Sequence, residues 1–132
     1  MAAIGRGLLA LVGAARGDGP AQAAWMAEKL AHLRMFEGPA GRLDRSVLDI
    51  GGEILVVSQF TLLGDTRKGR RPDFTAAASA EAARPLVDAV VDKLRRLGVQ
   101  TLTGIFQAHM VVSLENDGPV TLILESPAPP PA

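Results

Sequence analysis

The segment Ser58–Thr61, with the sequence Ser-Gln-Phe-Thr, places two hydroxyls and an amide at the end of a run rich in Ile, Leu and Val. A serine or threonine hydroxyl becomes a nucleophile only when a neighbouring base removes its proton. The only histidines of the sequence are His32 and His109, and no spacing brings either to Thr61. The residues alone therefore favour a strand end whose polar side chains bond to nearby backbone. Acyl hydrolysis by Ser58 or Thr61 is the alternative.

A second segment with unusual chemistry is Thr66–Pro72, which contains four cations, Arg67, Lys68, Arg70 and Arg71, in a chain of zero net charge. A solvated run of charges is the common interpretation of such a loop. Arginine, however, binds phosphate through paired hydrogen bonds, and no glycine-rich nucleotide-binding loop accompanies these cations. A local phosphate-binding patch for RNA is therefore the sharper alternative.

The third segment, Asn116–Thr121, has the sequence Asn-Asp-Gly-Pro-Val-Thr. Asn, Asp and Gly favour tight turns, but a proline cannot donate to a strand ladder. An X-Pro bond is cis in only about 5–6% of cases in folded proteins. Composition alone therefore predicts an ordinary turn with a trans proline.

Composition narrows the class of protein that can carry these segments. The chain has 132 residues, of which 48% are hydrophobic and 21% charged, and it has no cysteine. This profile is typical of one soluble domain without disulfides. No apolar run reaches the roughly 20 residues of a membrane span, and two histidines do not form a zinc cluster. We expect a cytoplasmic protein with no metal, no cofactor and no membrane partner.

The elements that must position these segments follow from apolar spacing and turn residues. Helices are predicted over residues 21–34 and from an N-cap at Ser79 to a stop at Gly98. Pro85 would shift the start of the second helix towards Arg84. The predicted strands are residues 8–12, 35–36, 53–60, 99–103, 110–114 and 120–125. Two helices on a mostly antiparallel sheet imply a mixed, layered α/β domain over residues 1–126, followed by a proline-rich disordered tail over residues 127–132.

The three segments, in this order, resemble the D-aminoacyl-tRNA deacylase family. The matching stretches are Leu55–Leu62, Asp65–Pro72 and Met110–Thr121, and the flanking residues Ile4–Leu9 and the Trp25–Arg34 helix also fit. The similarity extends from about Ile4 to Ser126, which is nearly the whole chain.

The resemblance implies an editing hydrolase that cleaves D-aminoacyl-tRNA, and also glycyl-tRNA mischarged on alanine tRNA, with tRNA and not DNA as its nucleic acid. It implies a homodimer with active sites at the interface. In that arrangement Gly118 and Pro119, joined by a cis bond, enter the partner's pocket. Their backbone carbonyls would collide with an L-side chain, while a D-side chain or glycine escapes, so specificity comes from a built-in clash.

By the same resemblance, Ser58, Gln59 and Phe60 surround the terminal adenosine. Backbone N–H groups near Phe60 and Thr61 stabilise the oxyanion. The 2′-hydroxyl of the terminal ribose assists hydrolysis, so a nucleophilic role for Thr61 is disfavoured. Met110 and Asn116 belong to the substrate pocket. The phosphates of the acceptor stem face the cations Arg67, Lys68, Arg70 and Arg71.

The sequence departs from the family pattern in two places. The family's opening strand and hairpin, with an arginine that supports the Gly-Pro unit, have no counterpart before Ile4. Either the first residue of the chain is assigned too late, or the protein is short. A short form would expose a sheet edge. A non-catalytic tRNA-binding or dimerising relative is therefore an alternative function. Gln107 stands where the family favours glycine and adds bulk near Met110.

Overall fold

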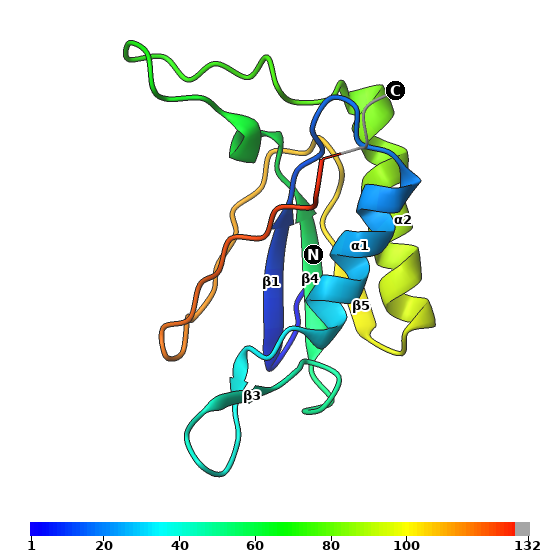
Figure 1. Ribbon diagram of the computed structural model, residues 1–132, viewed down its shortest axis with the longest axis vertical. Coiled ribbons are helices and arrows are strands. Elements are labelled where there is room, and N and C mark those ends of the chain that lie inside the picture. The colour runs from blue at the N-terminus through cyan, green and yellow to red at the C-terminus, as the bar shows by residue number, and fades with distance from the viewer. Residues whose placement is uncertain (129–132) are drawn as a thin grey trace.

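A three-stranded parallel sheet runs through the centre of the protein (Figure 1). In the computed structural model, which describes residues 1–128, the sheet has the order β1-β4-β5, with β1 at Gly7–Val12, β4 at Glu53–Ser58 and β5 at Gln100–Thr103. Both strand pairs are parallel, with Leu9 opposite Leu55 and Leu55 opposite Leu102.

The prediction of a mostly antiparallel sheet is therefore wrong. Helix α1, Pro20–His32, lies between β1 and β4 in the chain, and helix α2, Ala80–Arg96, lies between β4 and β5. A helical crossover returns the chain to the same end of the sheet, so the next strand runs parallel to the last. Named antiparallel strands occur in the described residues only in the small hairpin of β2, Phe36–Glu37, and β3, Leu43–Arg45.

Both predicted helices form, and the ends of α2 follow local rules. The Ser79 side chain accepts a hydrogen bond from the Ala82 N–H at 3.2 Å, which confirms the predicted N-cap. Pro85 lies inside α2, where it removes one backbone hydrogen bond. The helix nevertheless begins at Ala80 and not near Arg84, because the cap satisfies its first turn.

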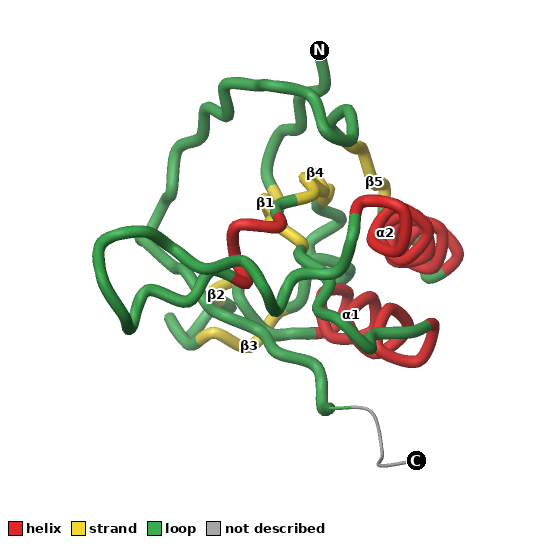
Figure 2. Tube along the Cα trace, turned by 90° about the horizontal axis from the view of Figure 1, so that it is seen from above, coloured by secondary structure: helices red, strands yellow, loops and turns green. Residues whose placement is uncertain are grey.

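The core lies between the sheet and the two helices, which pack on one side of it (Figure 2). Its largest fully buried side chains are Ile54, Val56, Val47 and Leu94. Ile54 and Val56 are on the central strand, so the strand that leads to Ser58 is held on both edges and one face. None of the helices within residues 1–128 has both the length and the apolar character needed to span a bilayer.

Residues 104–128 form an extended segment that we call the C-terminal arm. The arm passes the edge of β1 that faces away from β4 and returns towards the helices (Figure 1). The strands predicted at residues 110–114 and 120–125 are wrong, since neither segment is a strand in the structure. The reason is a missing partner: within residues 1–128, no backbone–backbone hydrogen bond involves residues 109–125. Most of the predicted tail, residues 129–132, lies outside the described residues.

A turn at the start of the arm gives a testable prediction. The Ala108 N–H bonds to the Ile105 carbonyl at 3.2 Å, and Gln107 has φ 63°. A positive φ at the third residue of a turn favours glycine, and an L-residue there costs about 1 kcal/mol. We expect Gln107→Gly to raise the free energy of unfolding by about this amount, measured by urea titration. The control Gln100→Gly, on β5, should lower it; a loss of stability in Gln107→Gly would contradict the assignment.

Candidate functional site

The segment Ser58–Thr61 lies where the central strand ends. Ser58 is the last residue of β4 and pairs with Val12 of β1, and the Gln59 N–H donates to the Val12 carbonyl at 2.8 Å. The chain then turns through a short 3₁₀ helix, η1, Phe60–Leu63. Phe60 is 56% exposed, so the turn presents this aromatic ring at the carboxyl end of the sheet instead of burying it.

The Thr61 hydroxyl is engaged by an amide and not by a base. Gln59 Nε2 donates to Thr61 Oγ1. Within residues 1–128, no hydrogen bond joins Thr61 to a histidine or a carboxylate. His32 instead lies on α1, where its Nδ1 is 3.2 Å from Glu28 Oε2. A hydroxyl without a base is a poor nucleophile, so the geometry supports a positioning role for this segment.

Met110 lies at the same end of the sheet as Ser58. The Gly104 N–H donates to the Val56 carbonyl at 3.1 Å, which ties the start of the C-terminal arm to β4. A Cβ on Gly104 would lie 3.4 Å from Met110 Cε and 3.7 Å from Val57 Cγ2. The structure therefore brings Met110 beside the strand that ends in Ser58.

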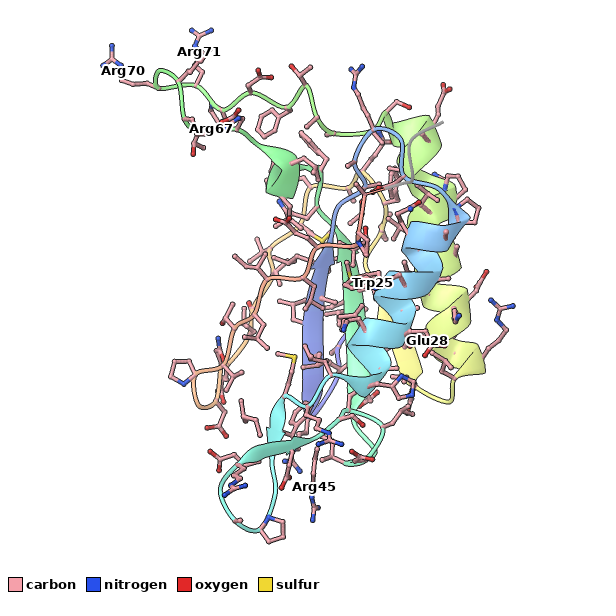
Figure 3. The ribbon with its side chains drawn as sticks, in the orientation of Figure 1. Trp25, Glu28, Arg45, Arg67, Arg70 and Arg71 are labelled. Carbon is pink, nitrogen blue, oxygen red and sulfur yellow. The ribbon has the colours of Figure 1, made fainter. Side chains whose placement is uncertain are left out.

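The cationic loop Thr66–Pro72 projects from the body and is closed at its neck. The N–H of Asp65 bonds to the carbonyl of Asp73 at 2.7 Å, and the reverse bond is 2.9 Å. Every residue from 66 to 72 is exposed. Arg70 and Arg71 lie at the tip and point away from the body, whereas Arg67 lies nearer the neck (Figure 3).

Arg67 is held by the neck itself. Its Nε and Nη2 donate to the two oxygens of Asp65 at 2.9 and 2.7 Å. This paired bond lowers the pKa of Asp65 and raises the pKa of Arg67. No ion pair within residues 1–128 reaches Lys68, Arg70 or Arg71. The loop thus contains one cation that shapes it and three that remain available to an anion.

The neck carboxylates predict how stability depends on pH. Hydrogen bonds from the Arg67 side chain lower the pKa of Asp65, and hydrogen bonds from Thr75 lower the pKa of Asp73. Such groups stabilise the fold above their unfolded pKa, and this contribution is lost as pH falls through the folded pKa. We expect the Tm to be level from pH 7 to about 5 and to drop below about pH 4. Circular dichroism melts would test this. Asp65→Asn should show a smaller drop, whereas an equal drop would remove Asp65 as a cause.

The Asn116–Thr121 turn differs from the expectation based on composition. The peptide bond between Gly118 and Pro119 is cis. The ordinary trans turn is therefore wrong, and the cis bond that the family resemblance implies is confirmed. The Asn116 side chain closes the turn, because its Nδ2 donates to Thr121 Oγ1 at 2.8 Å and its Oδ1 accepts from the Val120 N–H at 2.9 Å. Asn116 therefore supports the turn, while Gly118 and Pro119 are exposed at its tip.

Within one chain the predicted site residues do not all meet. The 116–121 turn lies at about the level of the amino end of β1, whereas η1 lies beyond the carboxyl end of the sheet (Figure 1). A hollow of about 520 Å³ on the surface contains none of them. It lies on the outer face of α1, where Lys29 Nζ is 5.2 Å from the centre of the Trp25 ring. Its lining residues are Trp25, Glu28, Lys29, His32, Leu33 and Arg34.

Sequence reasoning missed two aromatic contacts near the site. Phe74 packs edge-on against Phe60 with ring centroids 5.1 Å apart, and Arg84 of α2 lies 4.6 Å from the centre of the Phe106 ring. The signal that could have found them is scarcity. The chain has only four phenylalanines, so a phenylalanine close to a polar motif indicates a contact at the site more than a place in the core.

A family model and curated relatives match this chain over most of its length. The family model described as "D-Tyr-tRNA(Tyr) deacylase" matches residues 1–125. A Heliobacterium modesticaldum protein named D-aminoacyl-tRNA deacylase is 63% identical over 123 residues, covering 93% of this chain and 82% of that protein. A Thermomicrobium roseum protein of the same name is 58% identical over 126 residues, covering 96% and 82%.

Two solved structures are also similar to this one. The structure titled "c-Myc DNA Unwinding Element Binding Protein" has a TM-score of 0.88 and 41% identity, covering 95% of this chain and 85% of its own. A structure of a probable eukaryotic D-amino acid tRNA deacylase has a TM-score of 0.63 at 18% identity, covering 80% and 77%, and shares the fold. The match of the family model over residues 1–125, together with the 63% identical relative, shows that this chain belongs to the D-Tyr-tRNA(Tyr) deacylase family.

Proposed function

We infer that this chain hydrolyses the ester bond of D-aminoacyl-tRNA. The observation that carries this inference is the family match over residues 1–125, together with relatives of that name at 55–63% identity over most of the chain. The substrate is then an aminoacyl-tRNA. Nothing in the comparisons favours the non-catalytic RNA-binding relative.

Ser58, Gln59, Phe60 and Thr61 are the proposed wall of the pocket for the terminal adenosine and the ester. The first N–H groups of a helical turn have no partner inside the turn. Within the described residues, no backbone acceptor bonds to the N–H of Phe60 or Thr61. These two donors are the proposed oxyanion site. Met110 lies close enough to add an apolar side to the same pocket.

Gly118 and Pro119 are the proposed selectors of amino-acid handedness. Backbone suits this role, because its position does not depend on a rotamer. The Asn116 side chain further fixes the turn through its bonds to Thr121 and Val120. An L-side chain collides with this edge, whereas a D-side chain escapes it. Glycine has no side chain, so glycyl-tRNA mischarged on alanine tRNA is a second proposed substrate.

The chain is proposed to act as a homodimer with its sites at the interface. Along the C-terminal arm, Val111 and Ile123 are each 89% exposed, and Leu114 and Leu122 are also exposed. An exposed apolar stretch whose backbone bonds are unmade favours association. A second copy would cover the arm. It would also bring the Gly118–Pro119 edge to a pocket that its own chain does not reach.

The loop cations Lys68, Arg70 and Arg71 are proposed to bind acceptor-stem phosphates, with Arg67 holding the loop in shape. We expect the double variant Arg70→Ala and Arg71→Ala to weaken tRNA binding and to reduce the slope of log Kd against log salt by about two. The kcat should change little, because the pocket wall is intact. Arg42→Ala, which removes an exposed arginine of the β2–β3 loop, is the control. An unchanged slope in the double variant would remove the loop from the RNA interface.

The central experiment measures amino-acid release from tRNA charged with D-tyrosine or L-tyrosine. The purified folded chain should release D-tyrosine at least about 10²-fold faster than L-tyrosine. Equal release, or none, would overturn the proposed function. Because one similar structure has a title naming DNA binding, duplex DNA is included as a competitor. Inhibition by DNA as strong as that by uncharged tRNA would contradict a preference for tRNA.

A further inference from the structure

Phe74 connects the cationic loop to the proposed pocket wall. It is the first residue after the loop neck at Asp73, and its ring meets the Phe60 ring at an interplanar angle of 72° with centroids 5.1 Å apart. Edge-to-face pairs of this kind have a preferred geometry as well as an area of contact. The pair therefore joins the neck of the cationic loop to Phe60, the first residue of η1.

The fit around this ring is close. A Cβ on Gly64 would lie 2.9 Å from Phe74 Cε1 and 3.0 Å from the Thr61 carbonyl oxygen. The absence of a side chain at Gly64 lets the ring lie against the turn, while the Gly64 N–H bonds to that same carbonyl at 3.0 Å. Phe60 is more than half exposed, so the pair lies outside the hydrophobic core. The contact is therefore defined by its edge-to-face geometry more than by burial.

The segment that carries Phe74 is also attached to the body. The Arg16 N–H bonds to the Ala76 carbonyl, and the Ala78 N–H bonds to the Ala14 carbonyl, both at 2.9 Å. Residues 66–72 beyond the neck are exposed and project from the body (Figure 3). The neck and the Phe74 ring therefore lie between the loop tip and η1.

We propose that Phe74 is a positioning residue that sets Phe60 and the N–H groups of Phe60 and Thr61 relative to RNA bound on the cationic loop. This inference rests on the proposed function, because it assigns those N–H groups to the ester oxygen. A misplacement of about 1 Å in such a site can reduce the rate by about 10²-fold. Phe74 acts through Phe60 and needs no contact with the substrate.

The kinetic test uses Phe74→Leu, which keeps apolar bulk and removes the ring edge. We expect kcat on D-tyrosyl-tRNA to fall about tenfold, while KM and the Kd for uncharged tRNA stay within about twofold because the loop cations remain. Phe74→Tyr keeps the ring and should restore kcat. The matched control is Phe36→Leu. It removes the aromatic ring of β2 whose centre lies 5.5 Å from the Arg6 guanidinium, and it should leave kcat unchanged.

Amide hydrogen exchange gives a readout independent of catalysis. Adding uncharged tRNA to the wild-type chain should slow exchange in both the loop and Phe60–Leu63. In Phe74→Leu, the loop should still respond and Phe60–Leu63 should not. Unchanged kcat in Phe74→Leu, equal losses in Phe36→Leu, or retained protection of Phe60–Leu63 would overturn the proposal. Wild-type protein that binds tRNA but releases no D-tyrosine would instead overturn the proposed function, and exchange would still test the coupling.

Discussion

A Gly118→Ala variant is expected to lose about 10²-fold in kcat/KM on D-tyrosyl-tRNA and much of its preference over L-tyrosyl-tRNA. Gly118 has φ 140°, in a region that L-residues rarely adopt. An added Cβ would lie 2.9 Å from Val120 Cγ2 and 3.1 Å from Val120 N. The backbone of the turn must therefore move, and in the proposed function that backbone is the selecting edge.

The measurement is the ratio of D-tyrosine to L-tyrosine release, determined at equal concentrations of folded protein. Gly41→Ala is a matched control, because Gly41 also has a positive φ of 76° and has open space where its Cβ would lie. It lies in the β2–β3 loop, outside the proposed site. A wild-type ratio in Gly118→Ala would show that this edge does not select handedness.

The helices could be predicted from the sequence because their signals are local. Apolar spacing and the Ser79 cap belong to α2 itself, so they survive in any tertiary arrangement. Strand direction is not local, since it depends on what connects the strands. The buried apolar runs Leu8–Val12 and Ile54–Val57 are typical of parallel sheets with covered faces. That pattern is present in the sequence, but it does not by itself give the direction of each strand.

The C-terminal arm shows a different limit of sequence reasoning. Its apolar residues predict strands, and in the structure the segment is extended, but the described residues supply no ladder partner. A pattern can indicate that a segment is suited to pairing without indicating where its partner is. In the proposed homodimer, a second copy covers the exposed Val111 and Ile123.

The motifs were visible in the sequence, but their internal contacts were not. Composition indicated that Arg67 could bind phosphate, whereas the structure pairs it with Asp65, two residues earlier. The Phe60–Phe74 contact closes a loop whose neck is formed by Asp65 and Asp73. Such contacts depend on how a polar loop folds back, for which hydrophobic periodicity carries no signal.

If the chain forms the proposed homodimer through its C-terminal arm, an Ile123→Asp variant is expected to be monomeric, with an activity at least about tenfold below that of the wild type. Ile123 is 89% exposed in the single chain, so the substitution should leave the fold of that chain unchanged. A buried unpaired carboxylate at a dimer interface opposes association. Light scattering after size exclusion would give the mass. Leu43→Asp, at an exposed apolar residue of β3, is the control and should remain dimeric. A dimeric, active Ile123→Asp would place the interface elsewhere.

Mixed dimers decide whether the selecting edge and the pocket wall come from different chains. Phe60→Asp places a carboxylate beside the proposed oxyanion donors and should inactivate its own pocket, as Gly118→Ala should inactivate its own edge. When the two variants are co-expressed, a mixed dimer has one site with an intact wall from one chain and an intact edge from the other. Random pairing then recovers about one quarter of wild-type sites, whereas mixing the purified, non-exchanging homodimers recovers none. If each site uses the edge and wall of one chain, co-expression recovers nothing either, because every site then contains one of the two defects.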